Sequence, residues 1–163
     1  MGDTLGVISG WGFFGFWIGL WISPQRSLPQ VGYTLNVLGA EISVLYLLLS
    51  LIFLVPAFWL GLGGLRELGL KVSETHHPVK VVSGGVYSLL RHPQYLGGLL
   101  GHLGVSLLLS SRDSMLVTPL VVCVVYLISR KEEVELVRVF GDEYREYQSR
   151  VPMLIPRFGR DSQ

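Results

Sequence analysis

The stretch that decides the fold is "YSLLRHPQYLGGLLGHLGVSLLLS", Tyr87 to Ser110. It opens with polar residues, among them an Arg-His-Pro triplet, and continues as a long apolar run that contains one histidine. Proline suits the first turn of a helix, so Pro93 predicts that a helix begins there with His92 at or near its N-cap. The stretch therefore predicts a membrane helix whose entrance is polar.

The composition of the whole chain also indicates a membrane protein. Half of the 163 residues are hydrophobic and 15% are charged, whereas a soluble domain usually carries about 25% charged residues. The formal net charge is +1, so no nucleic acid or acidic partner is expected. Cys123 is the only cysteine, which excludes an intramolecular disulfide.

Four apolar segments are candidates for crossing a bilayer. They lie at about residues 5–22, 35–60, 94–110 and 115–129. Only "SRDS" separates the last two, which predicts an antiparallel helical hairpin. We expect an all-α, multi-pass transmembrane protein that forms a single domain over residues 1–163.

The distribution of basic residues predicts the orientation in the membrane. Of the 13 Lys and Arg residues, all except Arg26 and Arg112 fall in the polar blocks 61–92 and 130–163. The positive-inside rule places both blocks, and with them both termini, on the cytoplasmic side. The membrane is the cell membrane or the endoplasmic reticulum, depending on the source.

The predicted helix after Pro93 carries polar residues on one face. His92, Tyr95, Leu99 and His102 share this face, which runs from the membrane surface inward. The free backbone N–H groups at the start of this helix attract a carboxylate or a phosphate. One interpretation is therefore that the polar face lines a ligand-binding cavity. The alternative is an interfacial belt of Arg, His and Tyr. His102 lies deeper, and either belongs to a substrate site or is a neutral imidazole bonded to another helix.

The second polar block predicts a cytoplasmic amphipathic helix after the last span. Its apolar residues recur at helical spacing, and Gly141 is a candidate break. These residues are Val134, Val137, Phe140, Tyr144 and Tyr147. Glu132 and Glu133 come directly after the span, where membrane physics gives no reason for an acid. They either hold a ligand cation or pair with a nearby base, namely Arg91, Arg130 or Lys131.

Two kinds of site are not expected. His76 and His77 have no third ligand at a suitable spacing, so no metal centre is predicted. The sequence also has no P-loop and no G-x-G-x-x-G after a strand, so a soluble nucleotide-binding fold is not expected.

Two motifs together resemble the isoprenylcysteine carboxyl methyltransferase family, whose wider superfamily includes membrane phospholipid methyltransferases. They are "SGGVYSLLRHPQYLGG" and, after the helical hairpin, "EEVELVRVFGDEYREYQSRVPMLIP". The resemblance covers about Val79 to Pro156. It implies an integral membrane enzyme that uses S-adenosylmethionine to methylate a lipophilic acceptor: a prenylcysteine-like carboxylate, a lipid amine or a thiol.

The resemblance also implies a cofactor site built from residues 79–95 and 130–156. The side chains implied to contact the cofactor are Tyr87, His92, Tyr95 and Glu132, and the backbone contacts come from Val79, Lys80, Val81, Val82, Pro93 and Gln94. We assign catalytic roles to Arg91 and Glu132, and substrate binding to Arg130 and His102.

The sequence departs from the eukaryotic family pattern at one informative position. An Arg one turn before the acid is replaced by Ile128, with Arg130 nearby, so a prenylcysteine carboxylate acceptor does not follow. Two other functions stay open. One is an NADPH-dependent, sterol-reductase-like enzyme, and the other is a small non-enzymatic membrane interaction subunit.

Overall fold

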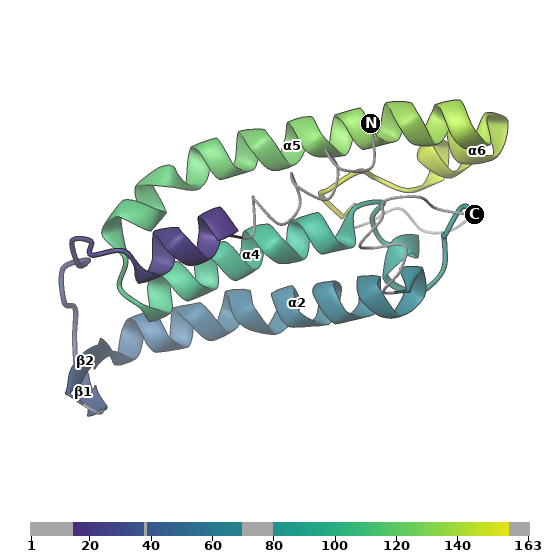
Figure 1. The fold of residues 1–163 in the computed structure, drawn as a ribbon. Helices are drawn as coiled ribbons and strands as arrows, with labels where there is room; N and C mark the ends of the chain where they lie inside the picture. Colours follow the sequence, from purple (N-terminus) through teal and green to yellow (C-terminus); the bar gives the residue numbers. More distant parts are fainter. Residues whose placement is uncertain (1–14, 38, 70–79, 157–163) are drawn as a thin grey trace.

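The structure, a computed structural model, describes residues 15–37, 39–69 and 80–156. Its elements are β1 (Thr34–Val37), β2 (Ala40–Ser43), α2 (Val44–Leu68), the 3₁₀ helix η1 (Gly85–Ser88), α4 (Pro93–Leu108), α5 (Arg112–Phe140) and α6 (Asp142–Arg150). Residues 15–22 are helical as well. Figure 1 shows α2, α4 and α5 running lengthwise, with the β1–β2 hairpin at one end and α6 at the other. The fold is mostly helical, as expected.

The predicted second span is displaced along the chain. We expected a helix at 35–60, but α2 occupies Val44–Leu68, and the residues before it form an antiparallel hairpin in which Leu35 pairs with Ile42. Gly39 explains the difference, since its φ of +87° makes a turn that its N–H stabilises by donating to Asn36 Oδ1 at 3.1 Å. The all-α prediction therefore misses one short hairpin.

The last span and the start of the charged tail form one continuous helix. The helical hairpin of α4 and α5 is present, but α5 begins at Arg112 and runs past the predicted end at Ser129 to Phe140. No glycine or proline interrupts residues 130–140, so nothing in that sequence ends the helix. Gly141, with a φ of +58°, separates α5 from α6 as expected.

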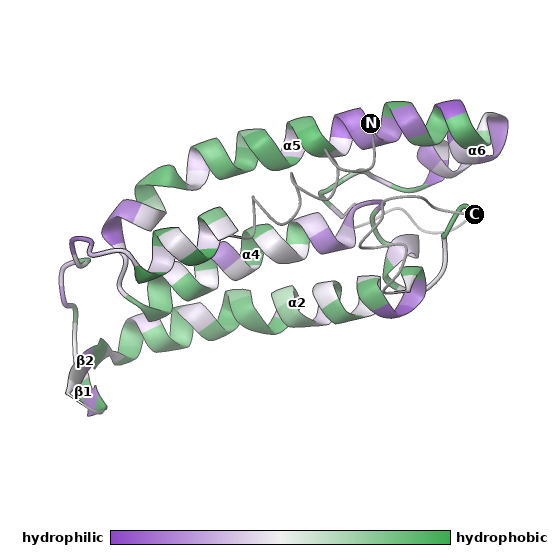
Figure 2. Cartoon of the chain, viewed as in Figure 1, coloured by the Kyte–Doolittle hydropathy of each residue, from purple (hydrophilic) through white to green (hydrophobic). Residues whose placement is uncertain are grey.

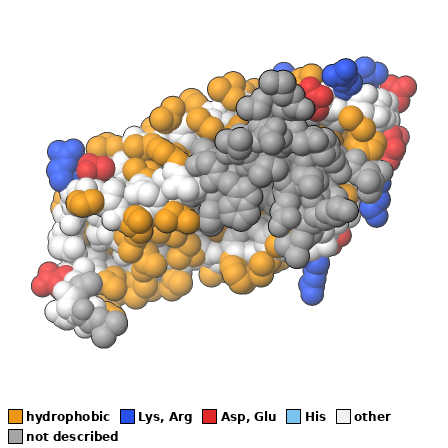
Figure 3. Space-filling model, in the orientation of Figure 1, with side chains coloured by type: hydrophobic (Ala, Val, Ile, Leu, Met, Phe, Trp, Pro, Cys, Tyr) orange, Lys and Arg blue, Asp and Glu red, His pale blue; other side chains and the backbone are white. Residues whose placement is uncertain are grey.

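Two of the described helices are long and apolar enough to cross a membrane, namely α2 and α5. The helix α4 has 16 residues, and the first predicted span is described only from residue 15. Figure 2 shows that α2 and the middle of α5 are largely hydrophobic. In Figure 3, hydrophobic side chains cover much of the visible body, and charged side chains lie toward its ends. Phe58 is 69% exposed and Val55 is 66% exposed, as is typical of a surface that faces lipid.

Small residues allow α2 and α4 to pack closely. A Cβ atom at Gly97 would lie 3.0 Å from the carbonyl oxygen of Ala57, and one at Gly104 would lie 3.2 Å from the backbone nitrogen of Leu54. Glycine at these two positions therefore lets the helices approach. Gly101, which lies between them in the sequence, has no such close neighbour, since the nearest atom to a Cβ there lies at 3.9 Å.

Candidate functional site

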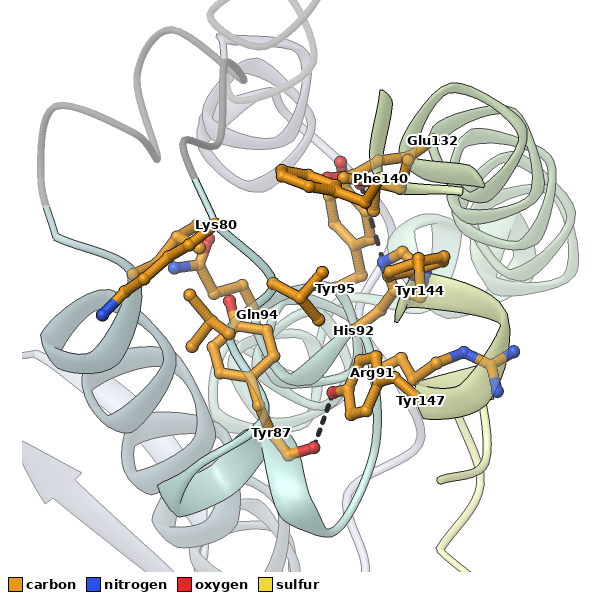
Figure 4. A pocket seen from close by; sticks show the side chains of 14 residues that line it. Lys80, Tyr87, Arg91, His92, Gln94, Tyr95, Glu132, Phe140, Tyr144 and Tyr147 are labelled. Atoms are coloured by element: carbon orange, nitrogen blue, oxygen red, sulfur yellow. Dashed lines mark hydrogen bonds and ion pairs between the residues drawn. The ribbon is translucent and has the colours of Figure 1, made fainter. Parts of the chain in front are cut away.

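A pocket lies at the end of the bundle where α4 begins and α5 leads into α6 (Figure 4). It holds about 700 Å³ of empty space including its open mouth. From the first polar block and the start of α4 it is lined by Leu68, Lys80, Val81, Val82, Tyr87, Arg91, His92, Gln94 and Tyr95. From the second polar block it is lined by Glu132, Leu136, Phe140, Tyr144 and Tyr147.

The two polar blocks that the sequence singled out thus meet at one pocket. Pro93 is fully buried beneath it rather than in its lining, and Val79 lies outside the described residues. His76 and His77 also lie outside them. Among the described residues, no group of acidic, His or Cys side chains is placed to hold a metal ion.

The start of α4 holds His92 in place. Pro93 occupies the first turn and His92 is the N-cap, as predicted. The backbone N–H of His92 donates to the carbonyl of Met153 at 3.1 Å, and that of Arg91 donates to the carbonyl of Pro152 at 2.9 Å. The C-terminal segment (residues 147–156) therefore occupies the N–H of the N-cap residue, one of the donors expected at this helix start, and also the N–H of Arg91 before it.

The imidazole of His92 lies between two carboxylates. Its Nδ1 is 3.6 Å from Glu132 Oε2, and its Nε2 is 3.4 Å from Glu133 Oε1. The ring stacks on Tyr95 with a centroid separation of 5.5 Å. Burial lowers the pKa of His92, but the two glutamates raise it by more, so the pKa lies above its usual value. His92 is therefore held toward its cationic form.

Arg91 points its guanidinium away from the open pocket and toward the C-terminal segment (Figure 4). Its Nε donates to Glu133 Oε1 at 2.5 Å, and its Nη1 donates to the carbonyls of Gln148, at 2.9 Å, and Val151. The side chain is 10% exposed. These contacts engage Arg91 in holding the fold, and its predicted catalytic role stays a prediction.

Two tyrosines join α6 to the loop before α4. The hydroxyl of Tyr147 donates to the backbone carbonyl of Tyr87 at 2.6 Å, and both residues are buried. Tyr144 packs edge-on against Tyr147. Burial, with the charge of Glu132 nearby, raises the pKa of the Tyr87 hydroxyl well above its usual value. Tyr87 therefore offers the pocket a neutral aromatic ring with a protonated hydroxyl.

For Glu133 the structure confirms one of the two alternatives that the sequence left open, because this glutamate pairs with Arg91. It is 3% exposed, and its Oε2 accepts a hydrogen bond from Gln148 Nε2 at 3.1 Å. The helical phase of α5 carried the signal, because the buried residues Val125 and Ser129 recur every four positions and lead to Glu133. Glu132 is 100° further back on the helix and lines the pocket.

The structure does not bring the two predicted substrate-binding residues to this pocket. Arg130 is exposed and lies on the outer face of α5, between Leu127 and Val134, which are each 64% exposed. His102 is fully buried, with Nε2 at 3.2 Å from Thr118 Oγ1 of α5. Its ring also stacks on Trp17 and Trp21. This geometry matches the alternative interpretation of His102 as an imidazole bonded to another helix.

Comparisons with known proteins place similarity over this same region. The family model for phospholipid methyltransferases matches residues 45–143. The chain is 38% identical over 79 residues to protein-S-isoprenylcysteine O-methyltransferase from Schizosaccharomyces pombe, covering 47% of this chain and 33% of the relative. It is 33% identical over 112 residues to methanethiol S-methyltransferase from Crocosphaera subtropica, covering 68% of this chain and 42% of the relative. The chain thus spans less than half the length of these relatives.

Proposed function

We propose, from the premise that the chain belongs to the phospholipid methyltransferase family, that it transfers a methyl group from S-adenosylmethionine to a lipophilic acceptor at the membrane surface. One observation carries the proposal. The pocket combines the aromatic side chains of Tyr87 and Tyr95 with Glu132 from α5, although these segments are far apart in the sequence.

The residues of the pocket fit the charges of this cofactor. Glu132 supplies a carboxylate for its cationic groups, with 33% of the side chain exposed. Tyr87, Tyr95, Phe140 and Tyr144 line the pocket and offer ring faces, which attract cations such as a sulfonium. For the carboxylate of the cofactor, Lys80 is a cation at the exposed edge of the pocket.

The cofactor, when bound, supplies an electrophilic methyl group. The residues of this chain bind and orient the cofactor and the acceptor and exclude water from them. These effects lower the activation barrier of a methyl transfer by direct displacement. A carboxylate or thiolate acceptor needs no general base. An amine acceptor has to lose a proton, and Glu132 is the pocket carboxylate that can accept one.

The acceptor is expected to be lipophilic. Two relatives are named for methylating isoprenylcysteine and methanethiol, and the pocket here has apolar walls in Val81, Val82 and Leu136. Since the pocket lies at the ends of helices whose outer faces are apolar, a molecule dissolved in the bilayer can approach it from the side. We place both ends of the chain and the pocket on the cytoplasmic side of a four-span domain, because the basic residues concentrate there.

Ligand binding tests this function against its alternatives. The experiment measures binding of S-adenosylmethionine and of NADPH to detergent-purified protein, as the parent, as Glu132→Gln and as the control Glu135→Gln. Glu135 is exposed on α5, and its carboxylate lies 3.9 Å from the guanidinium of Arg138. We expect the parent and the control to bind S-adenosylmethionine and Glu132→Gln to bind it more weakly. Binding of NADPH alone would favour a reductase, and binding of neither would favour an interaction subunit.

A further inference from the structure

We propose that Glu133 is a positioning residue that acts through His92 to orient Glu132 in the pocket, and that it links this acid to the C-terminal segment. The inference rests on the proposed function, because it takes Glu132 as the acid that meets the methyl donor. It assigns to Glu133 a role distinct from that of its neighbour, although the two glutamates are adjacent in the sequence.

The contacts of Glu133 leave it unavailable to a ligand. Oε1 accepts from Arg91 Nε at 2.5 Å and lies 3.4 Å from His92 Nε2, while Oε2 accepts from Gln148 Nε2. Its side chain is 5% exposed. A buried carboxylate is tolerated only when paired and hydrogen-bonded, and here each oxygen is engaged by the protein itself. Glu133 therefore influences the pocket only through its partners.

His92 lies between Glu133 and Glu132 and therefore couples the position of the buried glutamate to that of the pocket glutamate. Its side chain is 4% exposed, whereas that of Glu132 is 33% exposed. One ring nitrogen faces each glutamate, and the stacked Tyr95 limits rotation of the ring. The result is a row of alternating charges that runs from buried Arg91 through Glu133 and His92 to Glu132.

The row begins at the C-terminal segment. Arg91 donates to the carbonyls of Gln148 and Val151, and the backbone of Arg91 and His92 bonds to Pro152 and Met153. Docking of residues 147–153 and the orientation of the pocket acid are therefore parts of one network. Hydrogen bonds fix Arg91 and Glu133 in this network, and His92 joins it through charge contacts of 3.4 Å to Glu133 and 3.6 Å to Glu132.

The titration of His92 provides a test that needs no ligand. The charged and titratable groups around this row are Glu132 and Glu133 from α5, Arg91 before α4, Tyr95 from α4, Tyr144 and Tyr147 from α6, and Tyr87 from η1. Of these, only the two glutamates favour the charged imidazole. We expect the titration midpoint of His92, followed by NMR of ¹³C-histidine-labelled protein and assigned with His92→Gln, to fall in Glu133→Gln. The midpoint is expected to stay unchanged in the exposed control Glu135→Gln.

Binding of S-adenosylmethionine measures the effect on the pocket. We expect Glu133→Gln to weaken binding by about tenfold, and to have little further effect in a protein that already carries Glu132→Gln, because neighbours in one network are not additive. Gln148→Ala removes one hydrogen bond to Glu133 at a half-buried position. We expect Gln148→Ala to weaken binding of S-adenosylmethionine less than Glu133→Gln does. This variant replaces Glu133→Gln in the test if Glu133→Gln fails to fold.

The outcomes separate the two proposals. A parent protein that does not bind S-adenosylmethionine overturns the proposed function, while the His92 titration still decides whether Glu133 controls the ring. An unchanged His92 midpoint in Glu133→Gln contradicts the inference even if the parent binds the ligand. Losses of binding that simply add in the Glu132→Gln, Glu133→Gln double variant also contradict it.

Discussion

Arg91 and Glu133, 42 residues apart in the sequence, form a buried ion pair in which Nε lies 2.5 Å from Oε1. The pair joins the residue before the N-cap of α4 to the C-terminal part of α5. It stands directly behind the pocket, because His92 contacts the same carboxylate oxygen. This connection explains why the two polar blocks of the chain assemble into one site.

Replacing Arg91 with Ala is expected to destabilise the protein strongly. The change leaves Glu133 buried without its cation, and breaking a buried pair in this way costs about 3–5 kcal/mol. We expect a clear fall in the thermal unfolding midpoint in detergent. The control is Arg138→Ala, since Arg138 is 81% exposed and its pair with Glu135 is long, at 3.9 Å. Equal effects of the two changes would contradict the assigned role of Arg91.

Replacing Tyr147 with Phe is expected to loosen the contact between α6 and the loop before α4. The change removes the 2.6 Å hydrogen bond to the carbonyl of Tyr87, at a cost of about 1–2 kcal/mol. The loss of stability is measured by the thermal unfolding midpoint, and the loosening of α6 by its susceptibility to limited proteolysis. Tyr33→Phe is the matched control, because Tyr33 is 89% exposed. A midpoint unchanged in Tyr147→Phe would show that this hydrogen bond does not secure α6.

Replacing Gly97 with Ala is expected to push α2 and α4 apart. The new Cβ would lie 3.0 Å from the carbonyl oxygen of Ala57 and 3.1 Å from the nitrogen of Gly61, and such overpacking costs about 1–3 kcal/mol. Gly61→Ala on α2 is the control, since a Cβ there meets nothing within 4 Å. That change is expected to be neutral or stabilising, by up to about 1 kcal/mol from helix propensity. The prediction fails if both alanines have the same effect on the unfolding midpoint.

The contribution of His92 to stability is expected to depend on pH. Because the pKa of His92 is higher in the folded protein than in the unfolded chain, its stabilising contribution is complete below the unfolded pKa of about 6.5. It is lost as the pH rises through the folded pKa. The difference in unfolding midpoint between the parent and His92→Gln should therefore be largest near pH 6 and shrink as the pH is raised further. A difference that grows with pH has the opposite sign and rules out a charged His92.

Much of the site could be predicted from the sequence because its signals are local. Pro93 marks the start of α4, and the two motifs contain ten of the fourteen residues that line the pocket. The helix start was thus assigned correctly, and so was the break at Gly141. Local patterns suffice where one residue type restricts the backbone.

The remaining features depend on tertiary contacts or on competing local structure. Hydrophobicity alone predicts one helix over the β1–β2 hairpin and α2, because Leu35 and Val37 are as apolar as the residues of the helix. The turn of the hairpin depends on Gly39. The direction in which α5 faces α4 and α6 decides that Glu132 lines the pocket while Glu133 is buried. The occupation of the Arg91 and His92 N–H groups by Pro152 and Met153 depends on the path of the C-terminal segment.

The most direct measurement of the central claim is photo-crosslinking of radiolabelled S-adenosylmethionine to the detergent-purified protein, with the labelled peptides identified by mass spectrometry. The account predicts label in the peptides that contain Tyr87 and Tyr95 or Phe140 and Tyr144, competition by unlabelled S-adenosylmethionine, and weaker labelling in Glu132→Gln than in Glu135→Gln. Label confined to peptides away from this pocket, or labelling equal in the two variants, would contradict it.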